Sequence, residues 1–140
     1  MMCMIKIITG QTGEGKTKKM IEAANQAVTH IKGHAVYIDS TNTHRYALSH
    51  QVRLIEASTF PLKSQTDFFG FLCGILSANH DIEIVFIDEL VKLTHCCIDD
   101  LTQLFDRIRE LSDKYQVEFI IGTSCSHGDI PDHLTPYLIA

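Results

Sequence analysis

Short runs of consecutive apolar residues alternate along this chain with stretches in which apolar residues recur every three or four positions. The first pattern is typical of strands buried on both faces, and the second of helices that cover a sheet. The predicted strands are Cys3–Thr9, Ala35–Ile38, Ile82–Ile87 and Val117–Ile121, with Val52–Ala57 as an extra edge strand and Pro136–Ala140 as a short last strand. Strands and helices that alternate in this way predict a three-layer α/β/α sandwich with a mostly parallel sheet, formed by one domain over residues 1–140.

The helical pattern covers three long segments and one short one. They are Lys16–Lys32, Thr66–Ala78, Asp99–Tyr115 and a single turn within Arg45–His50. Gly33 suits the position after the first helix, and Asp99 or Asp100 can cap the start of the last one. Thr66–Ala78 is apolar around most of its circumference, so it is expected either in the core or against a partner.

Composition narrows the classes of function. The net charge is -5, with 12 basic and 17 acidic residues, so bulk electrostatics do not indicate a nucleic-acid-binding protein. No apolar run approaches the roughly 20 residues of a membrane span, and the start lacks the pattern of a signal peptide. The 5 cysteines include no Cys-x-x-Cys pair. We therefore expect reduced thiols in a cytoplasmic protein without a membrane partner.

The strongest chemical signal is a complete phosphate-loop motif between the first predicted strand and the first helix. Its residues are Gly10, Gln11, Thr12, Gly13, Glu14, Gly15, Lys16 and Thr17, which match G-x-x-x-x-G-K-[ST]. Glycines let the loop curl so that successive N–H groups face the phosphates, and the helix N-terminus adds partial positive charge. Lys16 is expected to contact the β- and γ-phosphates of a bound nucleotide, and the Thr17 hydroxyl to bind Mg²⁺.

A second acidic site follows a later strand. Ile84–Glu89 is apolar until it ends in Asp88 and Glu89, which resembles the Walker B element of P-loop NTPases. Carboxylates at the carboxyl end of a parallel strand lie where such sheets bind ligands. Asp88 is therefore expected to hold Mg²⁺, and Glu89 to deprotonate the attacking water. The alternative for Asp88 is a solvated turn residue.

With these elements in place, the chain resembles the RecA-like, additional-strand branch of P-loop NTPases. The resemblance implies a strand order of 5-1-4-3-2, in which the Asp88 strand is not adjacent to the Gly10 strand. It also implies that Thr123 or Ser124 senses the γ-phosphate, although hydroxyl residues are common in loops. Looser similarities connect the chain to cobalamin adenosyltransferases and thymidine kinases. An arginine finger, usual in this branch, is expected from Arg45, Arg53, Arg107, Arg109 or a partner.

Other polar residues have simpler interpretations. Asp39 is expected to cap the turn after its strand, and His95-Cys96-Cys97 lacks the spacing of a zinc site. His44, His50 and His127 fall in predicted loops at the ligand edge and remain weak candidates for ligand contacts.

Three functions remain open. The first is hydrolysis of ATP, or of another nucleoside triphosphate, with Mg²⁺ and at a slow rate without a partner. That partner is either a second copy in a homo-oligomer or another protein, and it supplies the arginine finger. The second is a nucleotide-dependent transferase that passes an adenosyl or phosphoryl group to a small molecule. The third is a nucleotide-binding accessory or switch module with little turnover.

Overall fold

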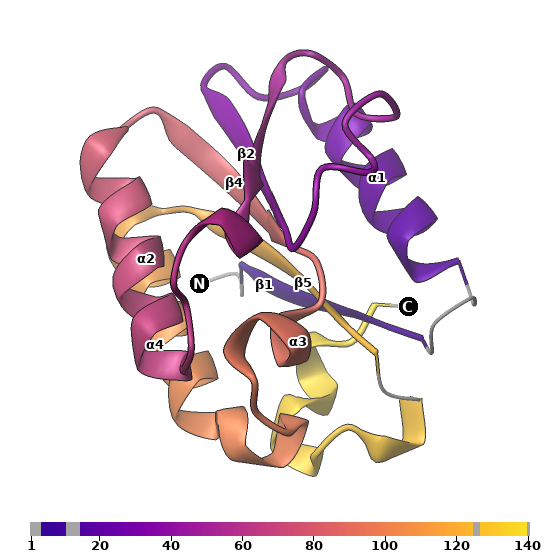
Figure 1. The fold of residues 1–140 in the computed structure, drawn as a ribbon, viewed down its shortest axis with the longest axis vertical. Coiled ribbons are helices and arrows are strands. Elements are labelled where there is room, and N and C mark those ends of the chain that lie inside the picture. Colours follow the sequence, from indigo (N-terminus) through magenta and orange to yellow (C-terminus); the bar gives the residue numbers. More distant parts are fainter. Residues whose placement is uncertain (1–3, 11–14, 125–126, 140) are drawn as a thin grey trace.

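The computed structural model describes residues 4–10, 15–124 and 127–139, which form a parallel sheet with helices on both faces (Figure 1). The strands are β1 (Ile5–Thr9), β2 (His34–Asp39), β3 (Val52–Glu56), β4 (Ile82–Ile87) and β5 (Glu118–Thr123). The helices are α1 (Lys16–Ala27), α2 (Gln65–Ala78), α3 (Leu90–Thr94) and α4 (Thr102–Tyr115). Short 3₁₀ turns cover η1 (Ala57–Thr59), η2 (Ile98–Leu101), η3 (His127–Asp129) and η4 (Asp132–Tyr137).

The strands follow the order β1-β5-β4-β2-β3, and every neighbouring pair is parallel. β1 lies beside β5 and not beside β4, as predicted, but it is an edge strand and not the predicted central one. The predicted order 5-1-4-3-2 is nevertheless not observed. Val52–Glu56 adds an edge strand next to β2, whereas the last described residues contribute only an isolated bridge between Leu138 and Ile7. Pro136, which has no N–H to donate, lies inside η4 instead.

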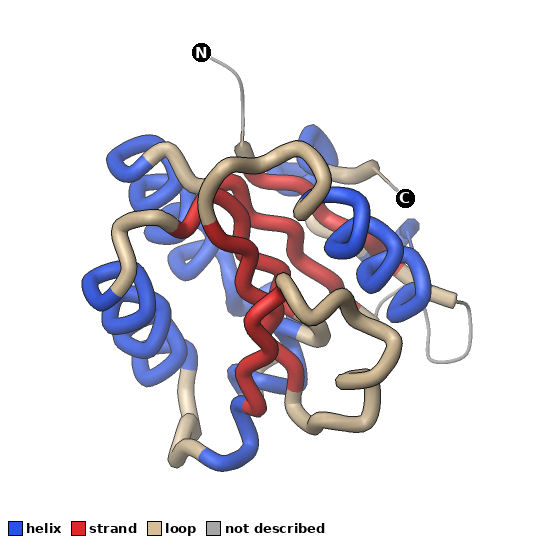
Figure 2. Tube along the Cα trace, turned by 90° about the horizontal axis from the view of Figure 1, so that it is seen from above, coloured by secondary structure: helices blue, strands red, loops and turns tan. Residues whose placement is uncertain are grey.

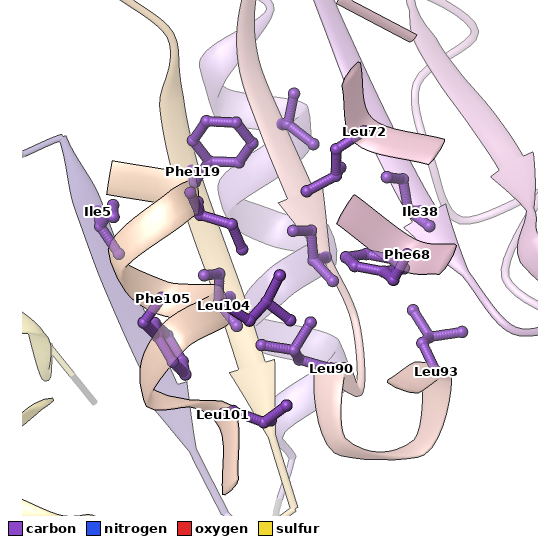
Figure 3. Packing of buried hydrophobic residues seen from close by; sticks show 14 of the residues in the cluster. Ile5, Ile38, Phe68, Leu72, Leu90, Leu93, Leu101, Leu104, Phe105 and Phe119 are labelled. Carbon is purple, nitrogen blue, oxygen red and sulfur yellow. The ribbon is translucent and has the colours of Figure 1, made fainter. Parts of the chain in front are cut away.

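The two faces of the sheet have separate cores, because successive side chains of a strand point to opposite faces. Helices α2, α3 and α4 cover one face, and α1 covers the other (Figures 1 and 2). Figure 3 shows the larger core, in which Phe68 and Leu72 of α2 and Leu104 and Phe105 of α4 pack against the strands. On the α1 face, Tyr37 and Phe86 lie side by side with ring centroids 5.9 Å apart. Because side chains alternate along each strand, the face on which its apolar residues are buried determines which polar residue at its carboxyl end points toward α1.

The observed helices differ from the predicted ones at several positions. α1 ends at Ala27 instead of Lys32, since the Thr29 hydroxyl donates to the Gln26 carbonyl at 2.6 Å and the chain turns there. α4 begins at Thr102 with Leu101 at its N-cap, so neither predicted aspartate caps it. Residues 45–50 form turns and no helix.

Gly33 has a role other than the predicted helix end. A Cβ at this position would lie 2.0 Å from the Asp81 carbonyl oxygen, which would force the backbone to move. The His34 N–H donates to that same carbonyl at 2.8 Å. Glycine is therefore required for the close approach of the two segments that lead into β2 and β4.

All five strands run in the same direction, so their carboxyl ends lie along one edge of the sheet. Thr9 is in register with Thr123, Ile121 with Ile87, and Ile87 with Ile38. The residues that follow these positions therefore come together from segments far apart in the sequence. None of the helices in the described ranges is long and apolar enough to cross a membrane.

Candidate functional site

The loop between β1 and α1 begins and ends on glycines with positive φ. Gly10 has φ of 153° and Gly15 has φ of 81°, values at which a side chain would be strained. Gly15 occupies the N-cap of α1, and its carbonyl accepts the Lys19 N–H at 3.1 Å. The predicted phosphate-binding residues Gln11, Thr12, Gly13 and Glu14 lie outside the described residues.

Lys16, the first residue of α1, points into the carboxyl edge of the sheet. Its side chain is only 4% exposed, and its ammonium group forms an ion pair with the Glu89 carboxylate. The same nitrogen lies 3.5 Å from Asp88 Oδ1 and 3.4 Å from Ser124 Oγ. Three predicted site residues, from the segments after β4 and β5, thus meet around one buried cation. Thr17 follows on the same turn and is half-buried.

Asp88, directly after β4, has two carboxylate oxygens in different situations. Oδ2 accepts a hydrogen bond from the Tyr37 hydroxyl at 3.0 Å. Oδ1 is buried and has no hydrogen-bond partner within the part of the chain that the structure describes. An unsatisfied buried acceptor is costly, roughly 1–3 kcal/mol and more when charged. Asp88 is therefore not the solvated turn residue of the alternative interpretation, and one of its oxygens is available to a ligand.

Glu89 reaches the same cluster through an unusual backbone conformation. Its φ of 64° and ψ of 58° are left-handed, which costs a non-glycine residue roughly 1–3 kcal/mol. In a continued strand, Glu89 would point to the face opposite Asp88. The left-handed turn instead brings its carboxylate to Lys16, where Oε2 also accepts the hydroxyl of Ser124. Strain of this kind clusters at functional sites.

The two predicted sensor residues occupy different environments. Thr123 is the last residue of β5, fully buried and in register with Thr9. Ser124 is the next residue, and its hydroxyl contacts both Lys16 and Glu89. Of the two, the structure brings Ser124 into the cluster.

Asp39, the last residue of β2, is a buried carboxylate whose two oxygens both have partners nearby in the sequence. Its Oδ1 accepts the Ser40 N–H at 2.7 Å, which confirms the predicted capping of the following turn. Its Oδ2 lies 3.2 Å from His44 Nδ1. This histidine was a weak candidate for ligand contact, and the structure shows it holding Asp39.

Two of the arginine candidates lie elsewhere. Arg107 of α4 packs over the Phe69 ring at 3.8 Å, and Arg109 donates to the Tyr137 hydroxyl at 3.3 Å. Both arginines are therefore engaged on the α4 side of the molecule. Among the described residues, no group of three or more His, Cys, Asp and Glu side chains could hold a metal ion, and this includes the surroundings of Cys96.

Two residues that shape the site were not singled out from the sequence. Burial and the nearby Asp88 carboxylate raise the pKa of Tyr37 far above its usual range, so its hydroxyl remains a donor to Asp88. Gly122 allows close packing against Asp88 and Met20, because a Cβ at this position would lie 3.5 Å from Asp88 Oδ1 and 3.1 Å from Met20 Sδ. The alternation of side chains along a strand predicts that Tyr37 and Asp88 lie on the same face of the sheet. It does not predict that they are close enough to form a hydrogen bond.

Comparison of the chain with protein-family models and with curated proteins finds no match. The functional argument therefore rests on the residues of the site.

Proposed function

We propose that this protein is a P-loop NTPase with a RecA-like core, which binds ATP or another nucleoside triphosphate with Mg²⁺ and hydrolyses it. The observation that carries the proposal is the meeting of Lys16, Asp88 and Glu89 at the carboxyl edge of a parallel sheet. Parallel sheets of this type bind ligands at that edge. The placement of β5 between β1 and β4 also agrees with what the RecA-like resemblance implies.

The charges of the cluster suit a magnesium–phosphate ligand. One ammonium group faces two carboxylates, so the cluster has an excess of negative charge in a largely buried position. Asp88 Oδ1, which has no hydrogen bond within the described residues, is the oxygen that would hold Mg²⁺ together with the Thr17 hydroxyl. The metal ion, when bound, would neutralise charge on the phosphate oxygens during transfer.

Lys16 and Glu89 then have complementary parts in the reaction. Phosphate oxygens would compete with the Glu89 carboxylate for the Lys16 ammonium group. Once released, Glu89 can accept a proton from a water whose oxygen attacks the γ-phosphorus, while the bond to the β-phosphate oxygen breaks and the nucleoside diphosphate leaves. The Ser124 hydroxyl, already bonded to Glu89, would keep the carboxylate oriented toward the water.

Turnover is expected to be slow in the isolated chain. An arginine finger accelerates hydrolysis by about 10³–10⁵-fold in enzymes that use one. Arg107 and Arg109 are engaged on α4, which leaves Arg45, Arg53 or a partner. We propose that the finger comes from a second copy or from a protein partner. The free thiols of Cys73, Cys96 and Cys97 fit the proposed cytoplasmic location.

Replacing Glu89 by glutamine tests the catalytic part of the proposal. We expect Glu89→Gln to retain nucleotide affinity and to lower the hydrolysis rate by about 10²-fold or more, the usual scale of lost general-base catalysis. Glu56→Gln, at the end of β3 on the same edge, is the matched control and should keep the wild-type rate. Equal rates for Glu89→Gln and a measurably active wild type would refute the assignment of Glu89.

A further inference from the structure

A cavity of about 290 Å³ lies beside α3, the helix that follows Glu89, and has no part in the proposed hydrolysis. Three segments from the carboxyl side of the sheet enclose it: the residue after Asp39, the connection between β3 and α2, and α3 with the residue that follows it. Its lining residues are Ser40, Ala57, Ser58, Phe60, Leu62, Lys92, Leu93 and His95. The volume is close to the lower end of the roughly 300–1,000 Å³ of ligand pockets, so it suits a compact molecule.

The lining combines an apolar wall with basic side chains. Phe60, Leu62 and Leu93 supply the wall, while Lys92 and His95 supply nitrogen donors. Among the residues that the structure describes, no aspartate or glutamate lines this cavity, although the chain as a whole has a net charge of -5. Neither Lys92 nor His95 forms an ion pair with any other described residue. Lys92 therefore places a positive charge at this cavity in an acidic protein.

Helix α3 connects this cavity directly to Glu89. The helix has 5 residues and is bracketed by two non-glycine residues in the left-handed conformation, Glu89 with φ of 64° and His95 with φ of 58°. The Leu93 N–H donates to the Glu89 carbonyl at 3.0 Å. Leu90 and Leu93 anchor the helix in the core (Figure 3). Lys92 and Leu93 thus lie about one helical turn, roughly 5.4 Å along the axis, from the Glu89 backbone.

We infer that this cavity binds a small organic anion with a compact apolar body, such as an aromatic or branched carboxylate or phosphonate. Lys92 and His95 hold the anionic group, and Phe60, Leu62 and Leu93 contact the apolar body. The Ser40 and Ser58 hydroxyls add hydrogen bonds. Because α3 forms one wall and begins directly after Glu89, the bound anion also changes the environment of Glu89. The inference goes beyond nucleotide hydrolysis and does not depend on it.

Phenylphosphonate serves as the probe, with benzyl alcohol as its neutral counterpart. Amide resonances of the ¹⁵N-labelled chain are followed during titration without nucleotide. We expect saturable shifts at Ser58, Leu93 and Glu89 with phenylphosphonate, and at least about tenfold weaker binding of benzyl alcohol, the scale of one charge-assisted hydrogen bond. Lys92→Gln should weaken phenylphosphonate binding by a similar factor. Lys63→Gln, which removes a neighbouring exposed charge outside the cavity, should not.

Three results would overturn the inference. The first is the absence of saturable shifts in these residues at about 10 mM phenylphosphonate, beyond the range of a useful site. The second is equal affinity of the Lys92→Gln and Lys63→Gln variants for the probe. The third is binding that shifts Ser58 but leaves Glu89 unchanged, which would remove the connection through α3. The titration contains no nucleotide, so its outcome can be interpreted even if the protein does not hydrolyse nucleotides.

Discussion

Asp88 and Asp39 end two neighbouring strands of the same sheet, yet they serve different purposes. The residues before them, Ile87 and Ile38, are in register, and the two aspartates are 2% and 5% exposed. Both oxygens of Asp39 bind within the turn that follows it, to Ser40 and His44. Asp88 instead contacts Tyr37 and Lys16, which come from distant segments, and its Oδ1 has no hydrogen bond within the described residues.

The comparison shows that position at the ligand edge does not by itself define a ligand site. A carboxylate that satisfies both oxygens locally stabilises its own turn. A carboxylate that leaves a buried oxygen without a hydrogen bond, close to a buried cation, has a cost that a bound metal ion can offset. The predictions below separate these two roles.

The largest effect on nucleotide binding is expected from removing the Lys16 ammonium group, which lies beside Asp88. Lys16→Ala should weaken Mg-ATP binding by about 100-fold or more, because the triphosphate loses a charge-assisted contact and meets two unneutralised carboxylates. Lys18→Ala, an exposed lysine two residues further along α1, is the matched control. Calorimetry should separate the two variants clearly. Equal affinities would remove Lys16 from the site.

Exchanging each aspartate for asparagine tests the comparison itself. Asp88→Asn should weaken Mg-ATP binding about tenfold, since an amide is a poorer magnesium ligand than a carboxylate. Asp39→Asn should leave the affinity within about twofold and instead lower the free energy of unfolding by about 1 kcal/mol, the scale of one weakened hydrogen bond. Denaturant unfolding and calorimetry on both variants provide the readouts. If Asp39→Asn weakened nucleotide binding as much as Asp88→Asn, the two roles would not be distinct.

Tyr37→Phe tests a single hydrogen bond, from the Tyr37 hydroxyl to Asp88, which has no counterpart at Asp39. Near neutral pH the variant should lose about 1 kcal/mol of stability, because Asp88 Oδ2 loses its donor. The pKa of Tyr37 is raised in the folded state, whereas an unfolded tyrosine ionises near pH 10. The tyrosine's contribution is therefore fully present below about pH 10 and is lost above it, by up to about 1.4 kcal/mol per pH unit.

Unfolding curves of wild type and Tyr37→Phe between neutral pH and about pH 11 measure this loss. The stability advantage of the wild type should shrink above about pH 10. An advantage that stays constant across this range would mean that Tyr37 titrates normally in the folded protein.

The sequence was informative wherever a local pattern determined the outcome. The strand Ile82–Ile87 was predicted with its observed bounds, since its apolar residues, interrupted only by Glu83, stop at Asp88 and are typical of a strand buried on both faces. The pairing of β1 with β5 followed from the resemblance alone, and the second neighbour that the resemblance implied for β1 is not observed. Val52–Ala57 was also predicted to be an edge strand. The prediction did not say that this strand pairs with β2.

The site depended more on tertiary structure. Nothing in the residues after Glu89 determines a left-handed turn, yet this turn brings Glu89 to Lys16. Whether Thr123 or Ser124 contacts Lys16 depends on the residue at which β5 ends. A sequence pattern does not locate the end of a strand to within one residue. The Tyr37–Asp88 hydrogen bond joins residues 51 positions apart and could not be read from either segment.

A calorimetric titration of the wild-type chain with ATP, with and without Mg²⁺, tests the central claim most directly. We expect a saturable isotherm with one site per chain in the presence of Mg²⁺. The affinity should be at least about tenfold lower when EDTA removes the metal, since Asp88 then no longer contacts the nucleotide through a bound Mg²⁺. Heats that show no saturable binding up to about 1 mM Mg-ATP, or binding unaffected by EDTA, would contradict the assignment of the Lys16–Asp88–Glu89 cluster as a magnesium–nucleotide site.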